Sequence, residues 1–257
     1  MRILAIGDIN GEDGREFVYN NLGRIRDKYN IDFCVANGEN SAEPNGITRD
    51  IANTLFRCGV DVITMGNHTF NNYDVNKLFE EDFPIVRPAN LPPETLGEGY
   101  IIVDFFGTKI AVINLLGRVY MECVDCPFRK ADSIIEKIRD EADIIIVDFH
   151  AEATSEKMAM GFYLDGKVSA VLGTHTHIQT ADEKVLENGT AYITDVGMTG
   201  CHESILGVKK DIIIKRFLTS LPQRHEIEEG IATMNGVIID IDESSGKATS
   251  IERIQIS

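Results

Sequence analysis

The stretch Val168-Ser169-Ala170-Val171-Leu172-Gly173-Thr174-His175-Thr176-His177 decides the fold of this chain, because it joins a short apolar run to two closely spaced histidines. Alternate residues of an extended segment point the same way, so His175 and His177 can direct their imidazoles into one space at the end of a strand. Neutral imidazole is the commonest metal ligand among side chains. A pair of solvated loop histidines is the alternative that so short a motif leaves open.

Four other apolar runs also end in side chains that bind metals. These side chains are Asp8 after residues 4–7, Glu39 and Asn40 after 33–38, Asn67 and His68 after 62–66, and His150 after 144–149. Such short, nearly continuous apolar runs are expected of strands that are buried on both faces. Ligands of open α/β sheets bind beyond the carboxyl ends of the strands. Five strand ends would therefore offer carboxylates, amides and imidazoles to one rim, which favours a metal site over solvated histidines.

Amphipathic stretches between these runs predict parallel β-α-β units in the N-terminal part of the chain. Residues 13–28 have helical spacing. Thr48 is expected to cap a helix that ends at Gly59, and Asp74 is expected to cap the next one. Alternation of strand and helix is typical of parallel sheets.

The remainder of the chain combines a hairpin, a helix and a β-rich end. The predicted elements are strands at 100–105 and 109–115 joined by a turn at 106–108, a helix at 131–141, and strands at 191–194, 236–241 and 250–256. We expect two packed sheets flanked by helices. A chain of 257 residues suits one domain over residues 1–257, with room for a small insertion or cap within residues 70–130.

Composition excludes several classes of function. A net charge of −16 disfavours broad binding to nucleic acid, which needs a basic surface. The apolar runs are too short to cross a bilayer, and no secretory leader is recognisable, so we expect a cytoplasmic protein without membrane association. Five scattered cysteines do not suggest a disulfide framework, and the lone pair Cys123 and Cys126 is a weak metal or redox signal.

Two further features are similar to functional signals but do not support them. Residues 161–168 nearly match a phosphate-binding loop, but Val168 occupies the hydroxyl position and the segment precedes a strand instead of following one. We therefore do not expect a nucleotide loop there. His202 and His225 lie in polar surroundings without flanking ligands, and we expect them to be solvated.

The strand-end motifs, taken in order, resemble the metal-binding blocks of the calcineurin-like metallophosphoesterases. The motifs are Gly7-Asp8-x-Asn10, Gly38-Glu39-Asn40, Gly66-Asn67-His68, the single His150 and Gly173-x-His175-x-His177. The chain departs from the usual blocks at Asn10, Glu39, Thr69 and Thr174. The same departures match one branch of these proteins, and the chain resembles that branch, the YmdB-type phosphodiesterases. Longer strings carry this resemblance over nearly the whole chain, at residues 7–15, 37–40, 65–69, 87–90, 148–157, 173–182 and 193–200.

The resemblance implies a four-layer αββα sandwich of two mixed sheets flanked by helices, with a dinuclear metal site. Carried over by position, it assigns one metal to Asp8, Glu39, Asn40 and His177. It assigns the other metal to Glu39 as the bridging ligand, together with Asn67, His150 and His175. His68 would be the proton donor, and whether Asn10 touches a metal stays open. The implied activity is hydrolysis of cyclic nucleotides, notably 2',3'-cyclic AMP.

The chemistry of such a site is consistent with this assignment. Two cations roughly 3.5–4 Å apart can clamp a phosphoryl group and turn a bridging water into hydroxide near neutral pH. Mixed oxygen and imidazole ligands without thiolate favour iron or manganese, with zinc as an alternative, over calcium. A protonated His68 could give its proton to the leaving alkoxide.

We therefore expect a metal-dependent phosphodiesterase that hydrolyses a cyclic nucleotide with a metal-bridging hydroxide. Two alternatives stay open: a regulatory metal-binding protein that acts on RNA turnover or signalling through a partner, and a phosphomonoesterase or 5'-nucleotidase that uses the same site. We also expect a small cyclic nucleotide as substrate and a homo-oligomeric assembly. An RNA-processing or regulatory protein remains open as a partner.

Overall fold

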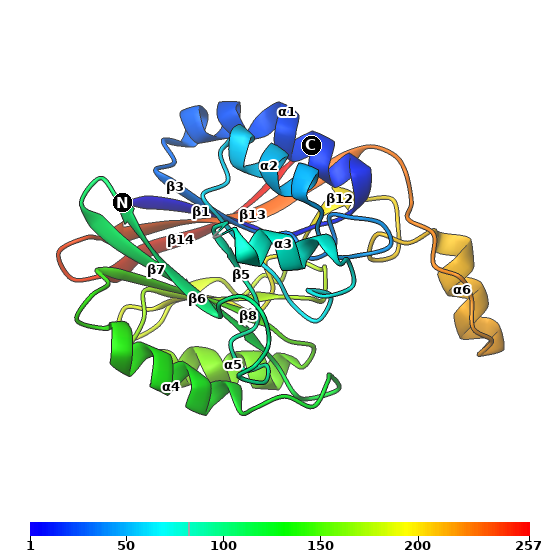
Figure 1. Cartoon of the computed structure of the whole chain (residues 1–257). Helices are drawn as coiled ribbons and strands as arrows, with labels where there is room; N and C mark the ends of the chain where they lie inside the picture. The colour runs from blue at the N-terminus through cyan, green and yellow to red at the C-terminus, as the bar shows by residue number, and fades with distance from the viewer. Residues whose placement is uncertain (82) are drawn as a thin grey trace.

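Two mixed β-sheets pack face to face between outer layers of helices (Figure 1). The computed structural model describes residues 1–81 and 83–257. One outer layer contains α1 (Gly11–Tyr29), α2 (Arg49–Cys58) and α3 (Asp74–Glu80), and the other contains α4 (Pro127–Ile138) and α5 (Thr154–Leu164). The prediction of a four-layer sandwich of two mixed sheets flanked by helices is confirmed.

The larger sheet has eight strands in the order β2-β12-β13-β1-β3-β4-β5, with β14 beside β13. Their bounds are β1 Arg2–Ile6, β2 Asp8–Ile9, β3 Phe33–Asn37, β4 Val62–Thr64, β5 Ile85–Val86, β12 Met198–Cys201, β13 Ala232–Asp242 and β14 Lys247–Ile256. Strands β1, β3, β4 and β5 run parallel, as the alternation of strands and helices predicts, whereas β13 is antiparallel to β1.

The smaller sheet has six strands in the order β10-β11-β9-β8-β7-β6. Their bounds are β6 Tyr100–Phe105, β7 Thr108–Leu116, β8 Ile144–His150, β9 Ala170–Thr174, β10 Lys184–Val185 and β11 Ala191–Ile193. The predicted hairpin is present as β6 and β7. Its turn residues Phe106 and Gly107 have φ values of 51° and 96°, the left-handed conformation that a two-residue hairpin turn requires.

Alternate residues of the central strands contribute to different cores. In β1, Ile3 and Ala5 pack between the two sheets, while Leu4 and Ile6 pack beneath the outer helices of the larger sheet. The two faces of a strand carry alternate side chains, so a strand buried on both faces must be apolar throughout. This is why the strands that lead to the polar motifs are continuous apolar runs.

Helix boundaries follow the sequence signals in one case and depart from them in another. Thr48 caps α2 as predicted, since its Oγ1 accepts the N–H of Ile51 at 3.3 Å, and Gly59 ends that helix with a φ of 112°. The prediction that Asp74 caps α3 is wrong, because Asp74 is already the first helical residue. The side chain of Asn72 accepts the N–H of Asp74 at 3.0 Å and so satisfies this end of the helix instead.

The start of α4 differs from the predicted one, whereas the near match to a phosphate-binding loop proves, as expected, not to be such a loop. Helix α4 begins at Pro127, four residues before the predicted start, because proline fits the first helical turn, where its missing N–H needs no partner. Residues 161–164 form the end of α5, and Gly161 packs closely on the ring of Tyr192. This agrees with the rejection of a nucleotide loop.

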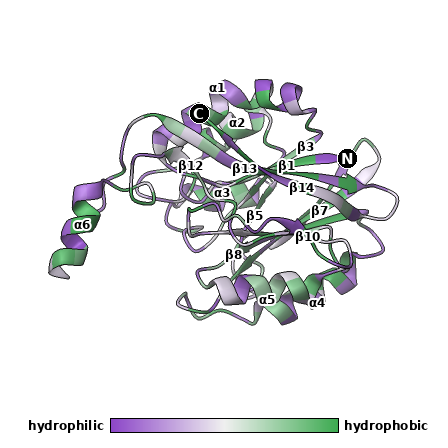
Figure 2. Ribbon diagram, turned by 180° about the vertical axis from the view of Figure 1, so that it is seen from behind, coloured by the Kyte–Doolittle hydropathy of each residue, from purple (hydrophilic) through white to green (hydrophobic). Residues whose placement is uncertain are grey.

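Helix α6 (Lys210–Thr219) projects away from the sandwich, and its sequence contains both hydrophobic and hydrophilic residues (Figures 1 and 2). We call residues 203–231, which carry this helix, the arm. Residues 70–130, where the sequence leaves room for a small insertion or cap, supply β5, β6 and β7 to the two sheets, and an insertion or cap there stays a prediction. That the whole chain forms a single domain stays a prediction. Within residues 1–81 and 83–257, no helix is long and apolar enough to span a membrane.

Candidate metal centre

The predicted ligands meet at one rim of the sandwich, where strands of both sheets end. The structure brings together Asp8, Glu39, Asn40, Asn67, His150, His175 and His177, with His68 beside Asn67. Asp8 follows β1, whereas His175 and His177 follow β9 of the other sheet. Each side chain lies at or just beyond the end of a buried strand, so its backbone position is fixed by the sheet behind it.

One group of donor atoms surrounds Nε2 of His150. Oε1 of Glu39 lies 2.9 Å from this nitrogen, Oδ1 of Asn67 lies 2.9 Å away and Nδ1 of His175 lies 3.0 Å away. Ligand atoms of Glu39, His150 and His175 all lie within 4.8 Å of one another. We call Glu39, Asn67, His150 and His175 the His150 cluster. One oxygen-rich and imidazole-rich space of this kind suits a transition-metal ion.

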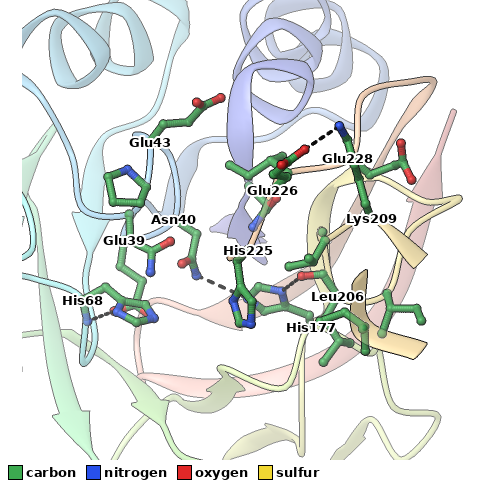
Figure 3. Close-up of a pocket in the computed structure, with 18 of the residues that line it drawn as sticks. Glu39, Asn40, Glu43, His68, His177, Leu206, Lys209, His225, Glu226 and Glu228 are labelled. Carbon is green, nitrogen blue, oxygen red and sulfur yellow. Dashed lines mark hydrogen bonds and ion pairs between the residues drawn. The ribbon is translucent and has the colours of Figure 1, made fainter. Parts of the chain in front are cut away.

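A second group lies beside the first. Nε2 of His177 is 3.2 Å from Nδ2 of Asn40 and 3.7 Å from Oδ1 of Asp8, and Figure 3 shows Asn40 directed toward His177. We call Asp8, Asn40 and His177 the Asp8 cluster. Oδ2 of Asp8 accepts the backbone N–H of His175 at 3.1 Å, so the two clusters are adjacent. The grouping agrees with the two predicted ligand sets, while their role as ligands stays a prediction.

The ring of His150 is oriented by a short chain of hydrogen bonds. The hydroxyl of Thr174 donates to Oδ1 of Asp148 at 2.7 Å and lies 2.9 Å from Nδ1 of His150. Because that hydroxyl proton goes to Asp148, the oxygen accepts the N–H of His150. Nε2 of His150 is then the nitrogen that can offer a lone pair to the cluster, as partners outside a metal site commonly arrange.

The other two histidines are oriented by different acceptors. Oε2 of Glu152 lies 3.1 Å from Nε2 of His175, and the carbonyl oxygen of Leu206 lies 3.1 Å from Nδ1 of His177. Each acceptor can take the ring N–H and leave the opposite nitrogen free to face its cluster. Leu206 belongs to the arm, so the arm touches the Asp8 cluster directly.

The charges of the rim fit a bound cation. Burial pulls the pKa of His150 down, but the carboxylates of Glu39, Asp8 and Asp148 outweigh it and raise that pKa to about 9. Burial also opposes ionisation of Asp8, yet His177 holds its pKa below the ordinary range, and His150 does the same for the pKa of Glu39. Buried carboxylates require compensating positive charge. Protons on imidazole supply it here, and metal cations can replace them.

His175 differs from the other two histidines. Burial, reinforced by the positive charge of His150, lowers its pKa to about 3. Its imidazole is therefore neutral over the physiological range. Neutral imidazole is the form that coordinates metals.

His68 lies over the rim instead of within either cluster. Its backbone N–H donates to Oε2 of Glu39 at 2.7 Å, and Nδ2 of Asn71 lies 2.9 Å from its Nδ1. The side chain lines the cavity above the clusters (Figure 3). This position fits a group that acts on a substrate, and its role as proton donor stays a prediction.

Asn10, whose role the sequence left open, borders the same cavity. Its amide packs against Gly207 of the arm so closely that a Cβ on that glycine would lie 2.4 Å from Oδ1. Oδ1 is buried and has no hydrogen-bond partner among the residues that the structure describes. Whether Asn10 contacts a metal stays open.

The cavity above the clusters has a volume of about 1450 Å³ and is closed on one side by the arm. Arm residues that line it include Lys209, Arg216, Phe217, Arg224 and His225. His225 is exposed, as expected, yet it faces the space that the clusters share, and its Nε2 lies 3.1 Å from the guanidinium of Arg216.

Sequence reasoning missed the charged residues that support the rim from outside. Glu152, Lys157 and Asp195 lie in strings that carried the family resemblance, but no local pattern indicated that they approach the ligands. Glu152 contacts His175, and Asp195 accepts the backbone N–H of Thr176. Glu152 and Asp195 lie two residues beyond β8 and β11, whereas Lys157 lies within α5 and gave no signal of its own.

Comparisons with known proteins agree with this geometry. The sequence model of the YmdB-like protein family matches residues 4–254. A 2',3'-cyclic-nucleotide 2'-phosphodiesterase from Bacillus subtilis (strain 168) is 49% identical over 257 residues, which cover 100% of this chain and 97% of the relative.

Two solved structures are similar over nearly their whole lengths. A hypothetical protein from Thermus thermophilus has a TM-score of 0.93 at 41% identity, covering 99% of this chain and 98% of that one. A phosphatase from Mycoplasma pneumoniae has a TM-score of 0.94 at 35% identity, covering 100% of this chain and 93% of that one. The similarity therefore extends over both sheets.

Proposed function

The chain belongs to the YmdB-like protein family, and on that premise we propose that it is a metal-dependent phosphodiesterase that hydrolyses 2',3'-cyclic nucleotides. The observation that carries the proposal is the meeting of two adjacent clusters of oxygen and imidazole donors beneath one cavity. The relative named for this activity is 49% identical and aligned over the whole chain, which supports the choice of substrate.

The residues of the two clusters would hold two cations. Asp8, Asn40 and His177 would bind one and Asn67, His150 and His175 the other, with Glu39 shared between them. We propose iron or manganese, with zinc as the alternative, because the donors are oxygen and imidazole without thiolate. When bound, such cations supply positive charge to the phosphoryl oxygens and make the attacking water more acidic.

His68 would complete the reaction as general acid. Opening the cyclic phosphate breaks one P–O bond to the ribose, and the released oxygen must take up a proton. The side chain of His68 faces the cavity, while the bond from its backbone N–H to Glu39 fixes it relative to the clusters. A proton held on this imidazole would pass to the ribose oxygen as the bond breaks.

The arm would select the rest of the substrate. The cavity of about 1450 Å³ is larger than a phosphate needs and can hold a nucleotide. Arg216 and Arg224 offer charge-assisted hydrogen bonds to phosphate, and the ring of Phe217 offers a face on which a base can stack. A cytoplasmic location, a homo-oligomer and a regulatory partner stay predictions.

Phosphomonoesterase activity at the same site is the second candidate, because a similar solved structure is described as a phosphatase. The deciding experiment measures turnover of 2',3'-cyclic AMP, 3',5'-cyclic AMP, 3'-AMP and 5'-AMP by metal-free protein reloaded with iron, manganese or zinc. We expect 2',3'-cyclic AMP to be the preferred substrate and the metal-free protein to be inactive. Preferred hydrolysis of the monophosphates would favour the second candidate, and the absence of all turnover would favour a regulatory protein.

A further inference from the structure

We propose that Asp195, paired with Lys157, is a positioning residue that sets the spacing between ligands from the two different sheets. The inference rests on the proposed metal centre and deepens it. Asp195 follows β11 of the six-stranded sheet, and Met198 already belongs to β12 of the eight-stranded sheet. The carboxylate thus lies where the chain crosses from one sheet to the other, directly behind the rim.

On one side, Asp195 holds the turn that carries two histidines. Its Oδ2 accepts the N–H of Thr176 at 3.0 Å and the hydroxyl of Thr176 at 2.7 Å. The neighbouring His175 and His177 have φ values of 99° and 64°. Residues other than glycine adopt this left-handed conformation uncommonly, and two of them in one short turn need restraints from their surroundings. The two bonds from Thr176 are such a restraint.

Lys157 binds the same turn from the interior of the protein. It is 1% exposed, and its ammonium donates to Oδ2 of Asp195 at 2.6 Å and to the carbonyl oxygen of Thr174 at 2.7 Å. Thr174 directly precedes His175. A charge this deeply buried needs its partner, because loss of either member leaves the other uncompensated. The pair therefore anchors the turn to a point inside the sandwich through both Thr174 and Thr176.

On its other side, Asp195 reaches the segment that carries Asp8. Its Oδ1 accepts the N–H of Gly197 at 2.9 Å, and the carbonyl oxygen of Gly197 accepts the N–H of Asp8 at 3.0 Å. Asp8 in turn accepts the N–H of His175 through Oδ2 at 3.1 Å, which closes a ring of hydrogen bonds. One buried carboxylate is thereby linked to ligands of both sheets.

The backbones of these segments are in direct contact. A Cβ on Gly7 would lie 2.0 Å from the carbonyl oxygen of Gly197, and a Cβ on Gly173 would lie 1.7 Å from that of Thr194. Backbones pressed this closely transmit a shift of Asp195 to both strand ends. Asp195 itself is 0% exposed and does not line the cavity, so it acts through the ligands and not on a substrate.

The two clusters depend on Asp195 to different degrees. In the Asp8 cluster, both Asp8 and His177 lie on segments that the carboxylate restrains. In the His150 cluster, His175 lies on the restrained turn, whereas Glu39, Asn67 and His150 lie on segments that the carboxylate does not touch. We therefore expect loss of Asp195 to weaken one of two bound cations much more than the other.

The test is titration of metal-free protein with Mn²⁺, measured by calorimetry, for the wild type, Asp195→Asn and Asp61→Asn. Asparagine has the same shape as aspartate but carries no negative charge. Because both oxygens of Asp195 accept hydrogen bonds, its NH₂ group would face at least one donor. Asp61 is the matched control: its Oδ2 accepts Arg26 at 2.9 Å and the N–H of Cys34 at 2.7 Å. It directly precedes β4 and so lies at the opposite end of the strands from the rim.

We expect two binding events in the wild type and in Asp61→Asn. In Asp195→Asn, one event should weaken by roughly 10- to 100-fold, the loss typical of residues that orient metal ligands. The other event should change by less than about threefold, since its ligands lie mostly outside the restrained turn. Equal affinities in wild type and Asp195→Asn would overturn the inference, and so would equal weakening of both events, which would indicate a general structural role. Absence of binding to the wild type would instead refute the proposed metal centre.

Thr176→Val keeps the test decisive if Asp195→Asn does not fold. It removes only the hydroxyl contact of 2.7 Å and leaves the buried ion pair intact. Circular dichroism establishes folding, and the same titration should show selective weakening of one event by several fold. Unchanged binding in a folded Thr176→Val protein would contradict the inference.

Discussion

The rim that carries the two clusters and the arm differ in how firmly the fold holds them. Asp8, Glu39 and His150 are buried, and each is bonded to residues of other strands or of the loops that follow them. Phe217 and Leu218 of the arm are 81% and 80% exposed. The protein therefore holds the rim in place without a bound substrate, whereas the arm has exposed side chains that can contact one.

In the proposed function, this difference assigns the chemistry to the rim and the selection of substrate to the arm. Side chains held by buried strands keep the geometry that metal binding and proton transfer need. An exposed segment joined to the rim through Leu206 can adjust to a substrate at small cost in packing energy. Substitutions in the rim should therefore abolish turnover, and substitutions in the arm should change which substrate is bound.

Glu39→Gln should have the largest effect, because both oxygens of this carboxylate are engaged and its charge is needed between two cations. We expect turnover to fall on the order of 10³-fold, together with loss of at least one metal, while the fold persists. Metal analysis and circular dichroism of the purified variant check this. Near-normal turnover with full metal content would show that the rim does not depend on Glu39.

His68→Ala should keep both metals and lose turnover of the cyclic nucleotide by roughly 10²- to 10⁴-fold, the range for general acid catalysis. The loss should be much smaller for a nitrophenyl ester, whose leaving group departs without a proton. Asn71→Ala, which removes only the neighbour of Nδ1, is the control and should cost far less. An equal penalty for both leaving groups would rule out the general acid.

Arg216→Ala tests the arm. We expect KM for the nucleotide to rise about tenfold with kcat and metal content nearly unchanged, since a hydrogen bond to a charged group contributes roughly 1.5 kcal/mol. Lys210→Ala is the matched control on the same helix, because Lys210 pairs with Glu203 and does not line the cavity. If kcat falls and KM stays constant, the arm takes part in the chemistry and the separation fails.

Thr48→Ala should have the smallest effect on function. Loss of the cap of α2 should lower the free energy of unfolding by about 1 kcal/mol, measured by urea denaturation, and leave kcat and KM unchanged. Helix α2 lies in an outer layer (Figure 1), and Thr48 is neither a predicted ligand nor a residue that lines the cavity. A large loss of turnover would show that the rim is less independent of the outer layers than its buried contacts indicate.

The strand ends could be predicted from the sequence because each signal is local. A strand buried on both faces must be apolar, so the polar residue at its end marks its boundary, as with Asp8 and His150. The family resemblance supplied the grouping of these residues. The two ends of α2 at Thr48 and Gly59 could be predicted for the same reason, since a cap and a left-handed glycine act within one helical turn.

Features that depend on distant contacts could not be predicted. Asp195 and Lys157 become neighbours only after β11 and β12 have joined different sheets. Helix α6 gave no signal because most of its apolar residues, among them Ile214 and Phe217, remain exposed and form no continuous buried face. The cap of α3 was misassigned because Asn72 and not Asp74 satisfies the end of that helix.

The most direct test of the proposed dinuclear centre is a crystal structure of the manganese-loaded protein with anomalous diffraction at the metal edge. We expect two anomalous peaks, one against Nε2 of His150 and Nδ1 of His175, and one between Asp8, Asn40 and Nε2 of His177. A single peak, or peaks away from these atoms, in a protein that hydrolyses 2',3'-cyclic AMP would contradict the claim that the two clusters form its catalytic metal centre.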